Sequence, residues 1–238
     1  GTFVGPDRSL MPRHPTSRPL TVPSPSTLFD DTSARMGLEP SQIEQLQRYV
    51  ETLGKWQPTL NLIGPKTWSD VWNRHVVDSL QCLDYADLPA GDGSGHPAPA
   101  PKLADIGTGA GFPGVVIAIT TGLPVTLVES DHRKAAFLLA VKSATGAPLT
   151  IVTKRVESLP AQPLDVLFAR AFAPLPRLLE WCAPLIGAPT TLVLHKGRTA
   201  AEEIQAAQES HDFEIESFPS VIDSDSVILR LRNVRSTR

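Results

Sequence analysis

The sequence predicts an α/β fold with a doubly wound, seven-stranded and mostly parallel sheet, preceded by a helical extension. From residue 103 onward, short apolar runs alternate with helical stretches, and this alternation is typical of right-handed β–α–β crossovers. The first four runs are continuously apolar, as expected for parallel strands covered on both faces. The last two runs are joined only by the short segment SVIDSD, which predicts a terminal antiparallel hairpin.

The composition is that of an ordinary globular protein. The 238 residues are 41% hydrophobic and 20% charged, with a formal net charge of −3. This slight negative charge excludes whole-molecule steering toward nucleic acid, so any RNA contact needs a local basic patch. Cys82 and Cys182 lie far apart with no Cys/His cluster, which predicts neither a metal site nor a disulfide framework. With no apolar run of membrane length and no signal peptide, we expect a monomeric cytoplasmic protein without a membrane anchor.

The N-terminal part of the chain divides into a tail and a helical region. Residues 1–27 hold six prolines and three arginines, which predicts a flexible Pro/Arg-rich tail. Residues 28–238 are expected to form one domain. Within it, a helix begins near a capping box of Ser41 and Glu44 and ends at Gly54, and a second helix covers Trp68–Leu83.

The remaining sequence is expected to alternate between strands and helices. Residues 28–88 form the helical region, 89–101 a loop without core residues, and 102–238 the sheet-containing core. Strands are predicted near 103–106, 125–129, 149–153, 165–169, 190–194, 213–218 and 227–232. Helices are predicted near 114–121, 132–145, 175–186 and 200–210.

A glycine-rich turn follows the first strand, in the run LADIGTGAGFPG at residues 103–114. Glycines allow backbone to approach a ligand closely, and the amides at the start of the next helix point toward it. Gly109, Gly111 and Gly114 satisfy G-x-G-x-x-G, and Glu129 lies 20 residues after Gly109, a pattern of nicotinamide-dinucleotide sites. The additional Gly107, two residues after Asp105, favours the form found in S-adenosylmethionine-dependent methyltransferases instead, with the Glu129 carboxylate on the cofactor ribose.

Basic residues follow the predicted strands, at the edge of the sheet where ligands bind in such folds. Their recurrence at successive strand ends in a slightly acidic protein indicates an anionic substrate. The sequence lacks the usual signatures for two other methyl acceptors. No [DN]-P-P-[YFW] motif, which is typical of methylation of the adenine amino group, follows the fourth strand, and neither cysteine follows a proline, as is typical of methylation of a pyrimidine carbon. A ring nitrogen needs neither a nucleophile nor a base, and alignment of donor and acceptor supplies most of the catalysis.

An ordered set of motifs resembles one family, the bacterial small-subunit ribosomal RNA guanine-N7 methyltransferases, also called glucose-inhibited division protein B. The matching stretches run from W-x-x-x-x-N-L-I at Trp56 through R-H-x-x-D-S at Arg74 and DIGTGAGFPG to RVES, ARAFAPL and HKG at His195. This resemblance covers about residues 40 to 232. It implies a Rossmann-like class I S-adenosylmethionine-dependent methyltransferase fold and transfer of a methyl group to N7 of a guanine in 16S rRNA, in the small ribosomal subunit or its assembly intermediate.

The resemblance also implies roles for individual residues. The expected cofactor contacts are Gly107, Gly109, Gly111, Phe112, Glu129, Val156, Glu157 and Arg170. The expected RNA contacts are Arg133, Lys134, Lys196 and Arg198, with Arg170 and Lys196 as catalytic candidates. His75 and Asp78 are expected to shape the site, although at this spacing they could also simply hydrogen-bond on a packed helix.

Two alternatives remain open from the sequence. A nicotinamide-dependent oxidoreductase would bind NAD(H) and have little affinity for S-adenosylmethionine. A noncatalytic RNA-binding module would bind RNA without any dependence on cofactor.

Overall fold

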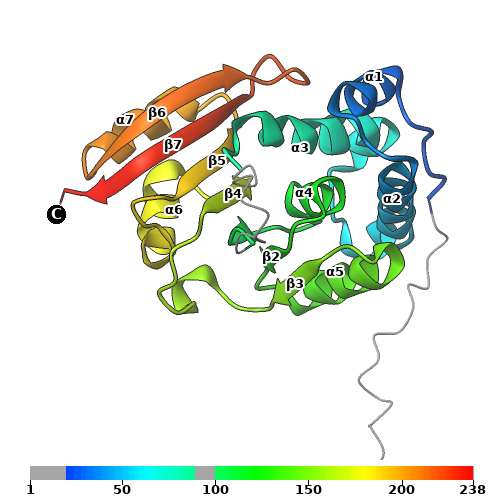
Figure 1. The fold of residues 1–238 in the computed structure, drawn as a ribbon, viewed down its shortest axis with the longest axis horizontal. Helices are drawn as coiled ribbons and strands as arrows, with labels where there is room; N and C mark the ends of the chain where they lie inside the picture. Colours follow the sequence, from blue (N-terminus) through cyan, green and yellow to red (C-terminus); the bar gives the residue numbers. More distant parts are fainter. Residues whose placement is uncertain (1–19, 89–99, 238) are drawn as a thin grey trace, which may run out of the picture.

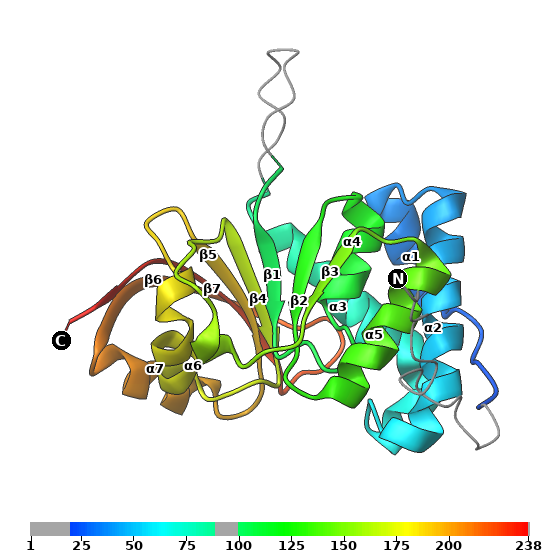
Figure 2. The same cartoon turned by 90° about the horizontal axis from the view of Figure 1, so that it is seen from below.

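The computed structural model describes residues 20–88 and 100–237, which fold around one seven-stranded sheet with helices on both faces (Figures 1 and 2). The strand order is β3-β2-β1-β4-β5-β7-β6. The strands are β1 (Leu103–Ile106), β2 (Val125–Val128), β3 (Leu149–Val152), β4 (Val166–Arg170), β5 (Thr191–Lys196), β6 (His211–Pro219) and β7 (Val227–Ser236).

Strand β7 alone runs against the others, since it pairs antiparallel with both β5 and β6. The pairs β1–β2, β2–β3, β1–β4 and β4–β5 are all parallel. This confirms the predicted sheet of six parallel strands and one reversed strand, closed by a hairpin. The strand order reverses between β1 and β4, and the carboxyl ends of strands at such a switch point are where this fold binds ligands.

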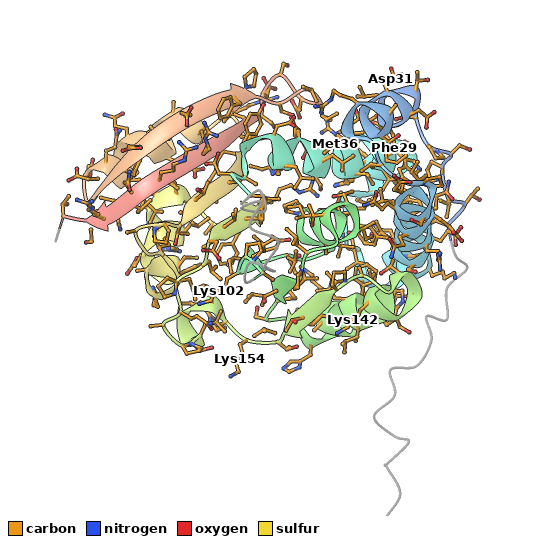
Figure 3. All side chains as sticks on the ribbon, in the orientation of Figure 1. Phe29, Asp31, Met36, Lys102, Lys142 and Lys154 are labelled. Atoms are coloured by element: carbon orange, nitrogen blue, oxygen red, sulfur yellow. The ribbon has the colours of Figure 1, made fainter. Side chains whose placement is uncertain are left out.

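The larger helical layer covers one face of the sheet (Figure 2). It contains α1 (Thr27–Met36), α2 (Pro40–Leu60), α4 (Gly114–Thr121) and α5 (His132–Thr145). Its apolar side chains form one continuous buried cluster with the sheet, and Figure 3 shows Phe29 on the inner side of α1 and Asp31 on the outer side. Phe29 packs on Trp72 with ring centroids 4.6 Å apart. The predicted N-terminal helical extension is therefore an integral part of the core.

The other face is covered by α6 (Leu175–Cys182) and α7 (Ala200–Gln208), and Figure 2 shows both on the opposite side of the strands. A second buried cluster lies between them and the sheet. The predicted helix 175–186 ends earlier, at Cys182, and a short 3₁₀ segment, η6 (Ala183–Leu185), follows it because Pro184 lies in that turn.

Helix α2 differs from its prediction at both ends. It begins at Pro40 with a capping box of Glu39 and Gln42, so the expected box of Ser41 and Glu44 is wrong. The helix also continues through Gly54 to Leu60. A Cβ on residue 54 would lie 2.8 Å from the Trp68 ring, so this glycine permits close packing rather than helix termination.

The helix predicted over Trp68–Leu83 forms as a continuous helical run, but it is not a regular α-helix. The segment consists of η2 (Pro65–Asp70, 3₁₀), η3 (Trp72–Val77, a π-helix), α3 (Asp78–Leu80) and η4 (Gln81–Tyr85, 3₁₀). π-Helical turns are rare in proteins, and those that occur are often found at functional sites. Here the π-helix contains Arg74 and His75, which line the cavity described below.

Part of the predicted flexible tail packs on the helical layer. The Leu20 amide donates to the Gly54 carbonyl, and the ring nitrogens of Trp68 and Trp72 donate to the carbonyls of Thr21 and Pro23. Residues 20–26 therefore belong to the folded domain, which corrects the expected boundary at residue 27. Residues 1–19, and the expected loop 89–101 apart from its last two residues, lie outside the described part of the chain.

Candidate functional site

The glycine turn after β1 is shaped by backbone conformations that favour glycine. Gly107, Gly109 and Gly111 have φ values of 66°, 58° and 96°, in the left-handed region where a side chain is strained. The Gly107 amide donates to the Val128 carbonyl at the end of β2, which fixes the turn against the neighbouring strand. A Cβ on Gly107 would lie 2.1 Å from the Phe172 ring. The turn therefore requires glycine for both conformation and space.

Asp105 supports this turn from below. Its Oδ2 accepts hydrogen bonds from Thr108 Oγ1 at 2.6 Å and from the Gly114 amide at 2.9 Å. Complete burial raises the pKa of the Asp105 carboxyl to about 6, although these two hydrogen bonds favour the charged form. The carboxyl thus ties the turn to the first residue of α4.

Glu129 holds its carboxylate beside the turn. Oε2 accepts from the Gly109 amide at 2.9 Å, and Oε1 accepts from the Asp131 amide at 2.8 Å. The side chain is only 7% exposed, so these bonds fix its orientation. Each carboxylate oxygen has two lone pairs, and the second one on each remains available to a ligand hydroxyl.

Arg170, at the end of β4, is held by the π-helical segment. Its guanidinium donates to Asp78 Oδ2 at 3.1 Å and to His75 Nδ1 at 2.7 Å. A guanidinium has no acceptor, so His75 Nδ1 carries no proton and His75 Nε2 donates to Thr67 Oγ1, 2.8 Å away. Burial, together with the charge of Arg170, lowers the pKa of His75 to about 3, and the ring is therefore neutral.

Asp78 is ionised and lies between two cationic groups. Burial acts to raise its pKa, but hydrogen bonding and charge from His195 and Arg170 outweigh this effect and lower the pKa to about 2. Burial alone would lower the pKa of His195. Two neighbours outweigh burial and raise this pKa to about 10: the Cys82 sulfur lies 3.6 Å from Nδ1, and Asp78 lies 3.3 Å from Nε2.

His75 and Asp78 both bind the Arg170 guanidinium and so fix its position.

Two cavities adjoin the glycine turn and share part of their walls. The first has a volume of about 440 Å³ and the second about 290 Å³, and the first lies in the range of small-molecule sites. The first is lined by Leu62, Ile63, Thr67, Arg74, His75, Asp78, Gly107, Thr108, Gly109, Ala110, Phe112, Glu129, Lys134, Arg170, Ala171, Ile222, Asp223 and Ser226. The second is lined by Ile106, Gly107, Val128, Glu129, Ser130, Lys134, Lys154, Arg155, Val156, Glu157, Ala171, Phe172 and Trp181.

Most of the residues expected at a site meet around these cavities. The expected cofactor-binding, RNA-binding and site-shaping residues that line them are Gly107, Gly109, Phe112, Glu129, Val156, Glu157, Arg170, Lys134, His75 and Asp78. Gly111 is not among them, because its Cβ position faces Val115 and Tyr49 on the inner side of the turn.

Three of the expected basic residues lie elsewhere. Lys196 has a side chain only 8% exposed and is bound to Glu203 at 2.8 Å and to the Ala173 carbonyl at 2.6 Å. Arg133 and Arg198 are 77% and 82% exposed, paired with Asp131 and Asp225 respectively. These pairs leave the two arginines on the surface outside the cavities.

Several residues in or beneath the cavities were not among the predicted site residues. Arg74 comes from the π-helix, Ile222 and Asp223 from the β6–β7 connection, and Trp181 from α6. Tyr49 of α2 reaches beneath the turn, where its hydroxyl donates to the Ala110 carbonyl at 2.6 Å. Only Arg74 lies within a recognised motif, so contacts from distant segments supplied the others.

The turn after β4 has a strained backbone. Ala171 has a φ of 50°, which costs of the order of 1 kcal/mol for a non-glycine residue. It lines both cavities between Arg170 and Phe172. Such strain is frequent where side chains are directed into functional sites.

Within residues 20–88 and 100–237, no group of three or more His, Cys, Asp or Glu side chains could hold a metal ion. Among the helices of those same ranges, none combines the length and the apolar character needed to cross a membrane.

Solved structures with a similar fold are S-adenosylmethionine-dependent methyltransferases and related enzymes. The chain matches a TehB-like SAM-dependent methyltransferase from Corynebacterium glutamicum with a TM-score of 0.50 and 15% identity, over 70% of this chain and 94% of that one. It matches a mutant of MtNAS in complex with S-adenosylmethionine with a TM-score of 0.52 and 17% identity, over 87% and 77%. At these identities the likeness concerns the fold, which is the predicted Rossmann-like class I fold.

Comparison of the sequence with known proteins shows the family as well as the fold. Two proteins named ribosomal RNA small subunit methyltransferase G are similar over nearly their whole length. The one from Rhodospirillum centenum is 40% identical over 90% of this chain and 94% of that protein, and the one from Paramagnetospirillum magneticum is 37% identical over 88% and 97%. Residues 42–226 match the family described as GidB, rRNA small subunit methyltransferase G. The chain belongs to this family.

Proposed function

We propose that this protein transfers the methyl group of S-adenosylmethionine to N7 of a guanine in 16S rRNA, within the small ribosomal subunit or its assembly intermediate, in the cytoplasm. The observation that carries the proposal is the glycine turn with Glu129 fixed beside it, in a chain of the rRNA small subunit methyltransferase G family. The fold supports the same cofactor.

The residues around the two cavities fit S-adenosylmethionine. Glu129 retains lone pairs that can accept hydrogen bonds from both ribose hydroxyls. The second cavity offers Val156, Phe172 and Trp181 as apolar and aromatic walls, which suit a purine ring. The first cavity, bounded by the turn and Arg170, then remains for the methionine portion and the acceptor base.

The reaction needs little from the protein besides alignment. S-adenosylmethionine supplies a methyl group activated by its positively charged sulfur. The lone pair on guanine N7 forms the new N–C bond as the S–C bond breaks, and the positive charge moves from sulfur to the base. No proton is removed, so no general base is required. Holding the two partners in line can supply about 7–11 kcal/mol of the barrier.

Arg170 is the residue best placed to hold this geometry. Its guanidinium is fixed by Asp78 and His75, and it lies 5.1 Å from the centre of the Phe112 ring. We therefore propose Arg170 as a positioning residue at the junction of cofactor and base. His75 and Asp78 act through it.

The basic residues have different proposed roles. Lys134 lines both cavities, and Arg133 and Arg198 are exposed, so these three are available to contact RNA phosphates. Lys196 is bound to Glu203 and to the Ala173 carbonyl. This binding supports a role in holding the connection after β4 rather than direct contact with RNA.

The proposal is tested with labelled S-adenosylmethionine and purified small subunits that lack the modification, in parallel with free 16S rRNA. After incubation, the RNA is digested to nucleosides and the label is located. We expect label in 7-methylguanosine, and much less of it with Arg170→Ala protein that remains folded.

Two results would overturn the proposal. Absence of labelled 7-methylguanosine with folded wild-type protein on both substrates would remove the activity. Tight binding of NAD(H) without binding of S-adenosylmethionine, measured by calorimetry, would replace it with the oxidoreductase alternative.

A further inference from the structure

The first cavity has an outer wall that does not belong to the sheet core. Thr67 and Arg74 come from η2 and η3, and Ile222, Asp223 and Ser226 come from the β6–β7 connection. The glycine turn and Arg170 line the same cavity. An acceptor base that entered beside the cofactor would therefore meet this wall.

Three carboxylates line the first cavity, and two of them already have a function in holding the site. Asp78 is bound to Arg170 and His195, and Glu129 is bound to the amides of Gly109 and Asp131. Asp223 differs from both, because 33% of its side chain is exposed. It is the carboxylate of the cavity that an incoming substrate reaches most easily.

The structure holds Asp223 in a defined orientation. Oδ2 lies 3.3 Å from an Arg74 guanidinium nitrogen, and Oδ1 accepts from the Asp225 amide at 3.0 Å. The Ser226 amide donates to the Asp223 carbonyl at 2.9 Å, which closes the turn. Each carboxylate oxygen thus has one partner and one lone pair left over.

A carboxylate repels RNA phosphates, so any contact of Asp223 with RNA must be made to hydrogen-bond donors on a base. Guanine has two adjacent donors, N1–H and the 2-amino group, on the edge of the purine opposite N7. Adenine has an acceptor at N1, which a carboxylate repels. A guanine with its donors on Asp223 would direct N7 away from this wall, toward the glycine turn.

We propose that Asp223 determines the base specificity of this site by accepting hydrogen bonds from N1–H and the 2-amino group of the target guanine. Arg74 holds the carboxylate in place for this purpose. The inference rests on the proposed function, because it concerns the acceptor of that same methyl transfer.

The test compares guanosine with inosine at the modified position. Inosine retains N7 and N1–H but lacks the 2-amino group. Small subunits are reconstituted from ligated 16S rRNA that carries one or the other base at the position found by nucleoside mapping, and kcat/KM is measured for both. Loss of one hydrogen bond to a charged acceptor should make the wild-type enzyme roughly 10- to 100-fold less efficient on inosine.

Two variants of Asp223 distinguish recognition from structural damage. Asp223→Ala should reduce the guanosine-to-inosine ratio to less than about threefold, because both acceptor oxygens are lost. The isosteric Asp223→Asn should also reduce the ratio, because one acceptor oxygen becomes a donor amide and the negative charge is removed. A structural defect would lower kcat/KM on both substrates equally and leave the ratio unchanged. Calorimetry should give the wild-type affinity of both variants for S-adenosylmethionine.

Asp225→Asn is the matched control. Asp225 lies in the same connection, but its side chain is 51% exposed, is paired with Arg198 and does not line either cavity. This variant should keep the wild-type ratio.

The outcomes separate the two claims. Methylation of guanosine by wild-type protein, combined with an unchanged ratio in both Asp223 variants, overturns the role of Asp223 and leaves the proposed function intact. Equal use of guanosine and inosine by the wild type does the same. Failure of wild-type protein to methylate any guanine overturns both.

Discussion

Replacing Gly107 with alanine tests the glycine turn against a control within the same chain. Gly107 and Gly122 have nearly the same φ, at 66° and 68°. A Cβ on Gly122 meets nothing within 4 Å, whereas a Cβ on Gly107 lies 2.1 Å from the Phe172 ring. The pair Gly107→Ala and Gly122→Ala therefore separates backbone strain from occupation of the site.

The expected losses of stability and affinity follow from backbone strain and from the clash of the new Cβ with the Phe172 ring. Alanine in the left-handed region costs about 1–2 kcal/mol, so both variants should lose this much free energy of unfolding. Only Gly107→Ala must also displace the Phe172 ring by about 1 Å or more, and this ring lines the second cavity. Overpacking of this kind costs about 1–3 kcal/mol, which corresponds to a loss of affinity of roughly 5- to 150-fold if the ligand needs the same space.

The assay combines calorimetry with chemical denaturation. Calorimetry gives the Kd for S-adenosylmethionine, and denaturation verifies that both variants are folded at the temperature used. We expect roughly 5- to 150-fold weaker binding for Gly107→Ala and a change of less than about twofold for Gly122→Ala. Equal Kd values for the two folded variants would refute the assignment of the turn to the cofactor.

Three further predictions address the groups around the turn. Tyr49→Phe removes the 2.6 Å hydrogen bond to the buried Ala110 carbonyl and should lower the free energy of unfolding by about 1–3 kcal/mol; a denaturation midpoint equal to that of the wild type would contradict this. Glu129→Gln loses an acceptor for the Gly109 or Asp131 amide and its charge at the proposed ribose site, so calorimetry should show about tenfold weaker binding of S-adenosylmethionine, and unchanged binding would exclude Glu129 from that site. The pKa of His195 is raised from 6.5 to about 10, so its stabilising contribution is complete below pH 6.5 and is lost as the pH rises toward 10. The stability advantage of wild type over His195→Gln should therefore shrink across this range, and an advantage independent of pH would contradict the charged state of His195.

Local signals predicted the sheet accurately. Continuous apolar runs located the first four strands, all seven strands lie near their predicted positions, and β1 and α4 have the predicted bounds. The reason is that a buried parallel strand must be apolar along its whole length. The errors lie in the helical layer, where Gly54 has the usual signature of a helix end. Its actual role depends on Trp68, 14 residues away, and this contact has no local signal.

The site was predictable where strand ends determine it. Glu129 and Arg170 follow β2 and end β4, so the topology alone brings them to one edge of the sheet. The partners of charged residues depend on tertiary contacts instead. Lys196 and Arg170 both end strands, yet one is bound to Glu203 and the other is held at the cavity by His75 and Asp78.

Asp223 is a second residue whose role depends on tertiary contacts and could not be predicted from the local sequence. In the sequence it is one acid in the segment SVIDSD, which reads as a solvated turn. Only the return of the β6–β7 connection to Arg74 makes it part of the cavity wall.

A crystal structure of the protein grown with S-adenosylhomocysteine tests the central claim most directly. The two ribose hydroxyls should lie within about 3.2 Å of the Glu129 carboxylate, with the homocysteine portion against Gly107 in the first cavity and the adenine in the second. A well-ordered ligand bound at another surface, with these cavities filled by side chains, would contradict the account.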